Sequence, residues 1–294
     1  MNSIPTVFCE SALFVLDSYL YVAPTVALIS GKFGFCANRL IQEGHIKNYD
    51  FVDGKHVGTV YFDYHDKLIK NDKSEKFNEK YAFQTSVFLR FRSEKISDMN
   101  LNLFGRILST KNVLELCLET AYIPESWVKF VSSWANLKSV EFYESFDDSG
   151  LTLLTNLVQK QQLHLCNLHQ PTYEKQEMKL LMYFLTQEQA RFLTLRKSNQ
   201  IFLKKLLKIW NYDSKKLNKK IITFQGYVNI PLKLKMRPRV SKTRIEYDFE
   251  GVDKGCMKSK LRPPWLIYLN NKATKDMEIE KFLEGVEETQ LRFR

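Results

Sequence analysis

The sequence has no hydrophobic run long enough to cross a bilayer. A transmembrane helix needs about 20 predominantly apolar residues, and charged or polar residues interrupt every apolar stretch of this 294-residue chain before that length. The apolar stretch near the N-terminus contains Glu10 and Asp17 and has no basic residue before it, unlike a signal peptide. We therefore expect a cytoplasmic or nuclear protein without membrane segments.

The sequence also lacks the residue patterns that bind metal ions or perform catalysis. Its five cysteines are odd in number and include no C-x-x-C pair, which indicates reduced thiols: Cys9, Cys36, Cys117, Cys166 and Cys256. No histidine stands in an H-E-x-x-H or H-x-E context, and G-x-S-x-G and G-x-G-x-x-G are absent. His164 lies near Cys166, but a strand would point both side chains the same way, without a third orienting group. We predict no enzyme, no metal site and no cofactor.

What the chain does have is a localised positive charge. Hydrophobic residues make up 44% and charged residues 26%, as in soluble globular proteins. The net charge is +11, and residues 204–262 hold 17 Lys and Arg against 5 Asp and Glu, so the rest of the chain is close to neutral. Such a segment is either a docking surface for an anionic partner or a solvated face.

Short stretches of alternating apolar and polar residues recur along the chain, each typical of a half-buried strand. The clearest covers residues 113–118, and its counterparts follow at intervals of 23 to 30 residues, with a helical pattern in almost every gap. The apolar pairs are Val87 and Leu89, Leu114 and Leu116, Val140 and Phe142, Leu163 and Leu165, Leu193 and Leu195, and Ile222 and Phe224. The expected helices lie near 98–108, 124–134, 147–158, 173–187 and 199–211.

This repetition predicts an α/β protein with an irregular, leucine-rich-repeat-like solenoid of parallel strands over residues 85–226. The position that usually holds Asn in such repeats holds other residues here. An ordinary α/β domain whose crossover units have similar lengths is therefore the alternative.

In a solenoid, the residues that alternate with the apolar pairs line the concave sheet face, where a protein substrate binds. The candidate substrate-binding residues are Arg90, Glu115, Glu141, Tyr143, His164 and Arg196. On this arrangement Glu115 and Glu141 are solvated and replaceable by Ala at little cost, whereas Leu116 and Phe142 are buried. An ordinary solvated sheet face has the same mixed composition and is the alternative.

Residues 4–42 have the apolar spacing of two consecutive helices. The segment opens with Ile4-Pro5, continues through Ser18-Tyr19-Leu20 and then carries Ile29-Ser30-Gly31-Lys32-Phe33. In these features it resembles an F-box, and its opening is similar to nematode F-box-related proteins. It departs from that family at Gly31 and Gly34, where stronger helix formers are usual, and at Phe33, where Trp is usual.

The resemblance implies that residues 1–45 bind the adaptor of a cullin-based ubiquitin ligase. The adaptor-binding candidates are Ile4, Pro5, Phe8, Leu13, Leu16, Leu20 and Phe33. A short apolar helical hairpin without a special function is the alternative.

Two further regions complete the expected organisation. Residues 46–84 are expected to form an irregular connection, with one strand-like stretch from His56 to Tyr64. Residues 227–294 are expected to form a basic C-terminal region. It would contain a basic edge strand or extended loop at 232–239, strands at 244–249 and 265–269, a helix at 275–286 and a closing strand at 291–293.

These patterns together predict a protein-interaction module, namely the substrate-recognition subunit of a cullin-based ubiquitin ligase. Its partners would be the ligase adaptor and a protein substrate. The alternative function is binding of a nucleic-acid backbone through residues 204–262, a segment whose basic residues lie among tyrosines.

Overall fold

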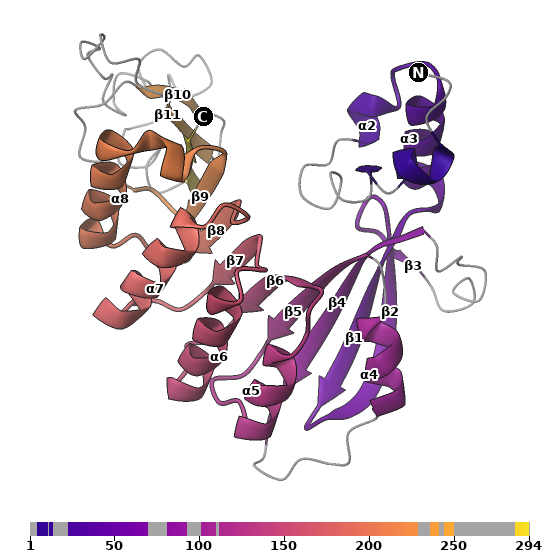
Figure 1. Ribbon diagram of the computed structural model, residues 1–294, viewed down its shortest axis with the longest axis horizontal. Coiled ribbons are helices and arrows are strands. Elements are labelled where there is room, and N and C mark those ends of the chain that lie inside the picture. Colours follow the sequence, from indigo (N-terminus) through magenta and orange to yellow (C-terminus); the bar gives the residue numbers. More distant parts are fainter. Residues whose placement is uncertain are drawn as a thin grey trace. The chain divides into compact units, whose positions relative to one another are not determined.

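The computed structural model describes residues 5–10, 12–13, 23–69, 81–92, 101–109, 112–228, 236–240, 244–249 and 286–293 (Figure 1). The chain divides into two compact units, Met1–Val140 and Glu141–Arg294. The division falls within strand β6 (Leu137–Phe142), whereas the sequence suggested boundaries near residues 45, 84 and 226. Each unit is α/β, and most of its neighbouring strands are parallel.

The first unit contains β1 (His45–Val52), β2 (Lys55–Asp63), β3 (Leu68–Ile69), β4 (Ala82–Arg90) and β5 (Val113–Leu118). Their order in the sheet is β3-β2-β1-β4-β5, followed by β6. Strands β1, β4 and β5 are parallel, whereas β1 and β2 form an antiparallel hairpin. The two residues of the hairpin turn, Asp53 and Gly54, both have positive φ angles of 50° and 81°. These angles are typical of a type I′ turn, for which Asp-Gly is a favoured pair.

Strand β1 lies in the region that the sequence predicted to be irregular. Its inward positions are His45, Lys47, Tyr49 and Phe51, all buried, and two of them have polar side chains. The Lys47 amino group lies 5.1 Å from the centre of the Tyr49 ring and 5.6 Å from that of Tyr61. Aromatic rings thus accommodate a cation at an inward position. Because that position holds Lys47, the sequence of β1 does not show the apolar alternation that marks a strand.

Helices α4 (Leu101–Leu108) and α5 (Glu125–Ser132) cover the inward face of β4 and β5 (Figure 1). Phe104 of α4 stacks on Phe51 of β1, with ring centres 4.5 Å apart, and its ring edge meets Trp127. Trp127 and Trp134 are buried, so these aromatic side chains belong to the core of the first unit.

The N-terminal part of the first unit is helical. Residues 6–10 and 12–13 are helical, and α2 (Ala23–Val26) and α3 (Lys32–Glu43) follow. One apolar cluster joins these helices to the ends of β2 and β4, and its buried members are Cys9, Leu13, Ala23, Cys36, Ala37, Leu40, Tyr64 and Phe83. The segment is therefore packed on the sheet through one of its faces.

The two glycines that depart from the F-box pattern are required by the backbone around α3. Gly31 precedes the helix with a φ of 91°, in the range that residues with a Cβ rarely adopt. At Gly34 a Cβ would lie 1.8 Å from the carbonyl oxygen of Ile29, so a larger residue would force the turn before α3 to move.

The second unit repeats a strand followed by a helix. Strands β7 (Leu165–Leu168), β8 (Phe192–Leu195) and β9 (Lys220–Gln225) are parallel neighbours. The helices are α6 (Asp148–Gln159), α7 (Lys175–Thr186) and α8 (Gln200–Tyr212), with the short 3₁₀ helix η3 (Ser214–Leu217) after α8. All three helices begin and end within two residues of the predicted bounds. Asp147 caps α6, and its side chain accepts hydrogen bonds from the backbone N–H groups of Ser149 and Gly150.

The C-terminal strands complete this sheet in the order β9-β12-β11-β10. Strand β12 (Glu288–Phe293) is antiparallel to β9 and parallel to β11 (Arg244–Phe249), and β10 (Met236–Val240) is the last strand beside β11. The predicted strand at 244–249, the closing strand and the edge strand are therefore present, although β12 lies inside the sheet. The strand expected at 265–269 and most of the helix expected at 275–286 lie outside the described residues.

The predicted inward positions are buried in β4, β5, β6, β8 and β9, but the prediction is wrong for β7. In β7 the buried side chains are Cys166 and Leu168, whereas Leu165 is half-exposed. Leu163 is buried, but the next buried position is Cys166, three residues later, so the alternation is interrupted at His164 and Leu165. At this point the backbone N–H groups of Arg191 and Phe192 both donate to the His164 carbonyl oxygen, at 2.8 and 3.1 Å.

Candidate interaction surfaces

The adaptor-binding candidates do not share one surface. Pro5 and Phe8 are exposed, Leu13 is buried in the apolar cluster and Phe33 packs against that cluster. Ile4, Leu16 and Leu20 lie outside the described residues. The residues counted as one stripe in the sequence therefore serve two roles, because some of them hold the helices on the sheet.

Several other apolar side chains of the N-terminal part are exposed. We call them the N-terminal apolar residues: Val7 (68% exposed), Phe8 (58%), Leu28 (86%), Ile29 (54%) and Phe35 (63%). The close approach of the Ile29 backbone to Gly34 places the turn before α3 beside the first turn of that helix, next to Phe35. The apolar stripes in the sequence did not include Val7 or Phe35.

Glu115 is not the solvated side chain that its position predicts. The Glu115 carboxylate on β5 accepts hydrogen bonds from Gln84 Nε2 at 2.7 Å, from Ser86 Oγ at 2.8 Å and from Ser139 Oγ at 2.9 Å. Ser86 and Ser139 are buried, with 2% and 3% of their surfaces exposed. Glu115 therefore joins three strands through their side chains, a structural role rather than that of a free recognition group.

Arg90 is engaged in a similar way at the end of β4. Its guanidinium group forms an ion pair with Asp50 at 3.2 Å and a second one with Glu119, and both carboxylates belong to neighbouring chain segments of the same unit. The hydrogen bond to Glu119 raises the pKa of Arg90 further above its ordinary value, as does the nearby charge of Asp50. The arginine is thus held as a permanent cation.

The second unit has a polar cluster on the sheet face opposite its helices. Glu141 accepts a hydrogen bond from Tyr143 Oη at 3.0 Å, and its other oxygen lies 2.7 Å from His169 Nε2. The Tyr143 and His169 rings stack with an angle of 4° between their planes and centres 5.2 Å apart. His169 Nδ1 lies 3.2 Å from Gln225 Nε2.

These contacts determine which nitrogen of the neutral His169 ring carries the proton. The Gln225 amide can only donate at Nε2, so His169 Nδ1 accepts and its Nε2–H donates to Glu141 when the ring is neutral. Both ring nitrogens and both Glu141 oxygens then have a hydrogen-bond partner. The cluster presents Tyr143, which is 41% exposed and whose hydroxyl group and ring are both held by neighbours.

The histidine of this cluster is His169 and not the predicted His164. His164 stands before β7, at the irregularity described above, and Cys166 is buried with a pKa raised by desolvation. A buried thiol with a raised pKa holds little of the thiolate form, which is the nucleophile. Arg196, the remaining candidate, is exposed and directs Nη1 to the His169 carbonyl oxygen at 3.4 Å.

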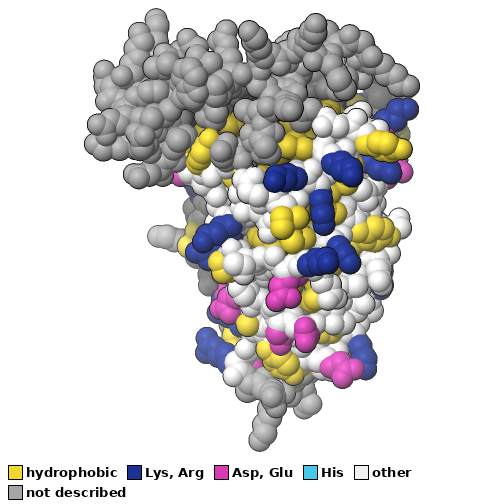
Figure 2. Space-filling view, turned by 90° about the vertical axis from the view of Figure 1, so that its left-hand side faces the viewer, with side chains coloured by type: hydrophobic (Ala, Val, Ile, Leu, Met, Phe, Trp, Pro, Cys, Tyr) yellow, Lys and Arg dark blue, Asp and Glu magenta, His cyan; other side chains and the backbone are white. Residues whose placement is uncertain are grey.

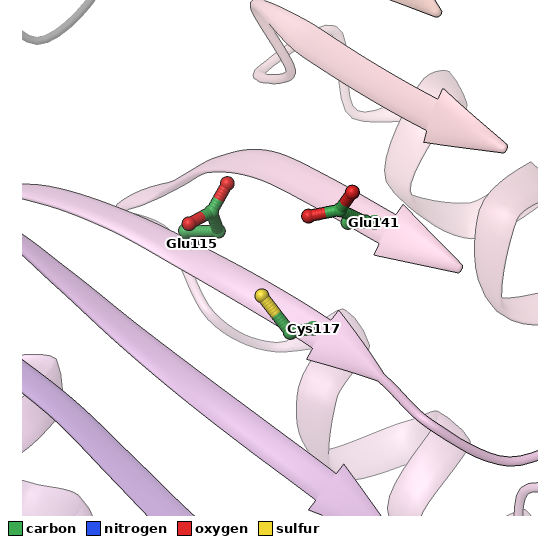
Figure 3. Close-up of side chains that lie close together, drawn as sticks. All are labelled: Glu115, Cys117 and Glu141. Atoms are coloured by element: carbon green, nitrogen blue, oxygen red, sulfur yellow. The ribbon is translucent and has the colours of Figure 1, made fainter. Parts of the chain in front are cut away.

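Two carboxylates and one thiol near the middle of the chain are of the types that bind metals. Glu115 and Cys117 are two residues apart on β5, and Glu141 lies on β6 (Figure 3). Cys117 is only 1% exposed, and the carboxylates have the protein partners given above. Because these hydrogen bonds account for both acidic groups, we assign no metal to them.

Comparison with protein-family models, curated proteins and solved structures gave no match for this chain. Among the described residues, none of the helices has the length and apolar character needed to cross a bilayer.

Proposed function

We propose that this protein is an interaction module that brings a protein substrate to a cullin-based ubiquitin ligase. The observation that carries the proposal is the exposure of the N-terminal apolar residues, which lie on helices and on the turn before α3, in a segment held on the sheet by the apolar cluster. Large apolar side chains gathered in one segment mark a site for a protein partner. The resemblance of this segment to an F-box points to the ligase adaptor as that partner.

The structure changes which residues we assign to the adaptor contact. Leu13 and Phe33 pack within the apolar cluster, so their loss would act through folding. Phe8, Leu28 and Phe35 are exposed and are the better candidates, because their removal leaves that cluster intact. An apolar helical surface of this kind suits a partner that offers an apolar groove.

The repeated strand–helix units would form the substrate-binding part, as in a leucine-rich-repeat-like solenoid. Tyr143 is the best candidate for an anchor, because tyrosine is enriched at binding hot spots and this ring is already held by His169 and Glu141. No residue needs to carry out ubiquitin transfer. The protein would act by raising the local concentration of substrate beside the catalytic subunits.

Affinity purification from cells that express the tagged full chain tests the adaptor contact. We expect the ligase adaptor and cullin to copurify with the wild type and to be lost with the double variant Leu28→Asp/Phe35→Asp. The control is Leu68→Asp, which places one such charge at an apolar position of similar exposure, 64%, on β3. Thermal melts of all variants check that each remains folded.

Two outcomes would contradict the proposal. Absence of both adaptor and cullin from the wild-type sample rejects the ligase function. Their equal recovery with wild type and the folded double variant shows that the N-terminal apolar residues do not form the contact.

A further inference from the structure

Helix α8 has two contrasting faces. Phe202, Leu203, Leu206, Leu207 and Trp210 are buried in the second unit, whereas Lys204, Lys205, Lys208 and Tyr212 are exposed. Tyr212 is 92% exposed, the most of any large hydrophobic side chain described. The helix contains no acidic residue, and the first acidic residue after it, Asp213, forms a salt bridge with Lys216.

Helix α7 continues this surface. Its exposed Lys179 and Tyr183 are four residues apart and lie on one side of the helix, and α7 packs beside α8. We call Lys179, Tyr183, Lys204, Lys205, Lys208 and Tyr212 the basic helical face. Figure 2 is a view of the side of the molecule on which α7 and α8 lie, and Lys and Arg side chains there alternate with hydrophobic ones.

The composition of this face distinguishes between anionic partners. An interfacial membrane helix needs its apolar side free to enter the bilayer, but the apolar side of α8 is buried in the protein. Lysine is depleted from protein–protein interfaces, and four of the six residues of the basic helical face are lysines. Basic side chains interleaved with exposed aromatic rings are the pattern that binds single-stranded nucleic acid, through phosphate contacts and base stacking.

We propose that the basic helical face binds single-stranded nucleic acid without strong sequence preference. The lysines of α8 would contact phosphates, and Tyr212 and Tyr183 would stack on bases. This function is independent of the ligase proposal, because it uses a surface of the second unit and none of the N-terminal apolar residues.

Fluorescence anisotropy with a labelled oligo(U) tests the proposal, using the full chain at several salt concentrations. We expect the variant Lys204→Gln/Lys205→Gln/Lys208→Gln to bind about tenfold more weakly or worse at moderate salt. The slope of log K against log salt should fall by about 2, because each phosphate contact with a single strand contributes ~0.7. The matched control, Lys55→Gln/Lys67→Gln/Lys129→Gln, removes the same charge from exposed sites of the first unit and should bind as the wild type.

A second set of variants tests whether the exposed tyrosines contribute to oligo(U) binding. Tyr212→Ala should weaken oligo(U) binding at every salt concentration, whereas Tyr212→Phe should retain it, because stacking does not need the hydroxyl group. Tyr122→Ala, at a 42% exposed tyrosine of the first unit, is the control. The proposal is overturned if the two triple variants bind oligo(U) alike. It is also overturned if vesicles with anionic lipid or an acidic peptide are bound more tightly than the oligonucleotide.

Discussion

At the scale of single residues, a polar side chain inside this fold is stabilising only together with its partners. Glu115 and Lys220 both belong to sets of groups that would be left without hydrogen bonds if one member were removed. Lys220 is 3% exposed, and its amino group donates to the backbone oxygens of Gln187 at 2.6 Å and Ala190 at 2.5 Å. A buried group that loses its partner costs more than the bond itself contributes.

Replacing Glu115 by Ala should therefore destabilise the protein, contrary to what its place on an alternating strand predicts. We expect a loss of about 1–3 kcal/mol in the free energy of unfolding, because the buried hydroxyl groups of Ser86 and Ser139 lose their acceptor. Urea denaturation measures the change. Glu125→Ala is the control: this carboxylate is 82% exposed on α5, and its removal should leave the free energy of unfolding close to that of the wild type.

Lys220 should give the protein a specific pH dependence. Desolvation, together with the charge of Arg191, lowers the pKa of Lys220 from its ordinary value of 10.5 to about 8. Between about pH 8 and 10.5 the unfolded chain thus holds a proton that the folded protein has released. The free energy of unfolding should rise with pH in this window, by up to about 1.4 kcal/mol per unit.

The variant Lys220→Met should lack this rise and should be less stable than the wild type at pH 7, because the carbonyl groups of residues 187–190 lose their donor. Urea denaturation between pH 7 and 10 gives both quantities. Lys205→Met, at an exposed site, should follow the wild-type curve. Parallel curves for the wild type and Lys220→Met would show that Lys220 titrates as an ordinary surface lysine.

At the scale of elements, the sequence predicts helices better than strand faces. Capping residues such as Asp147 and long apolar periods define the helices locally, within one turn of their ends. A strand of four residues has only two inward positions. One extra residue before it therefore exchanges the buried and exposed positions of the whole strand, as in β7. The spacing contained a clue: Leu116, Phe142, Leu168, Leu195 and Phe224 follow one another by 26, 26, 27 and 29 residues, more evenly than the series through Leu165.

Local sequence patterns predicted neither strand β1 nor the partner of Glu141 and Tyr143. The Asp53-Gly54 turn predicts a hairpin, but the inward Lys47 removes the apolar alternation that would identify its first strand. Glu141 and Tyr143 were placed correctly on their sheet face from alternation alone. Their partner His169 depends on the register of β7, which a tertiary hydrogen-bond arrangement decides.

Alanine substitution in β7 tests that register. Leu168→Ala should lower the free energy of unfolding by about 2–5 kcal/mol, because Leu168 is completely buried. Leu165→Ala should cost clearly less, since that side chain is half-exposed. Chemical denaturation of both variants decides the matter, and a larger loss for Leu165→Ala would restore the face predicted from sequence.

At the scale of the whole molecule, the described thiols report on how completely both units are folded. Cys9, Cys36 and Cys117 of the first unit and Cys166 of the second are free and buried. Burial is the main cause that raises the pKa of Cys36 and Cys166 above the ordinary value for a thiol, so little reactive thiolate is present at pH 8. A thiol reagent can then reach these four side chains only when the surrounding unit opens.

In the variant Cys256→Ser, which removes the one cysteine outside the described residues, we expect slow labelling of the native protein and rapid labelling of four thiols in denaturant. A reductant should leave the melting temperature unchanged, because no described cysteine is in a disulfide. Labelling followed by peptide mass spectrometry assigns the rates. Rapid native labelling of Cys9 or Cys36 alone would show that the N-terminal helices open independently of the sheet, and that the N-terminal apolar residues are presented by a detachable segment.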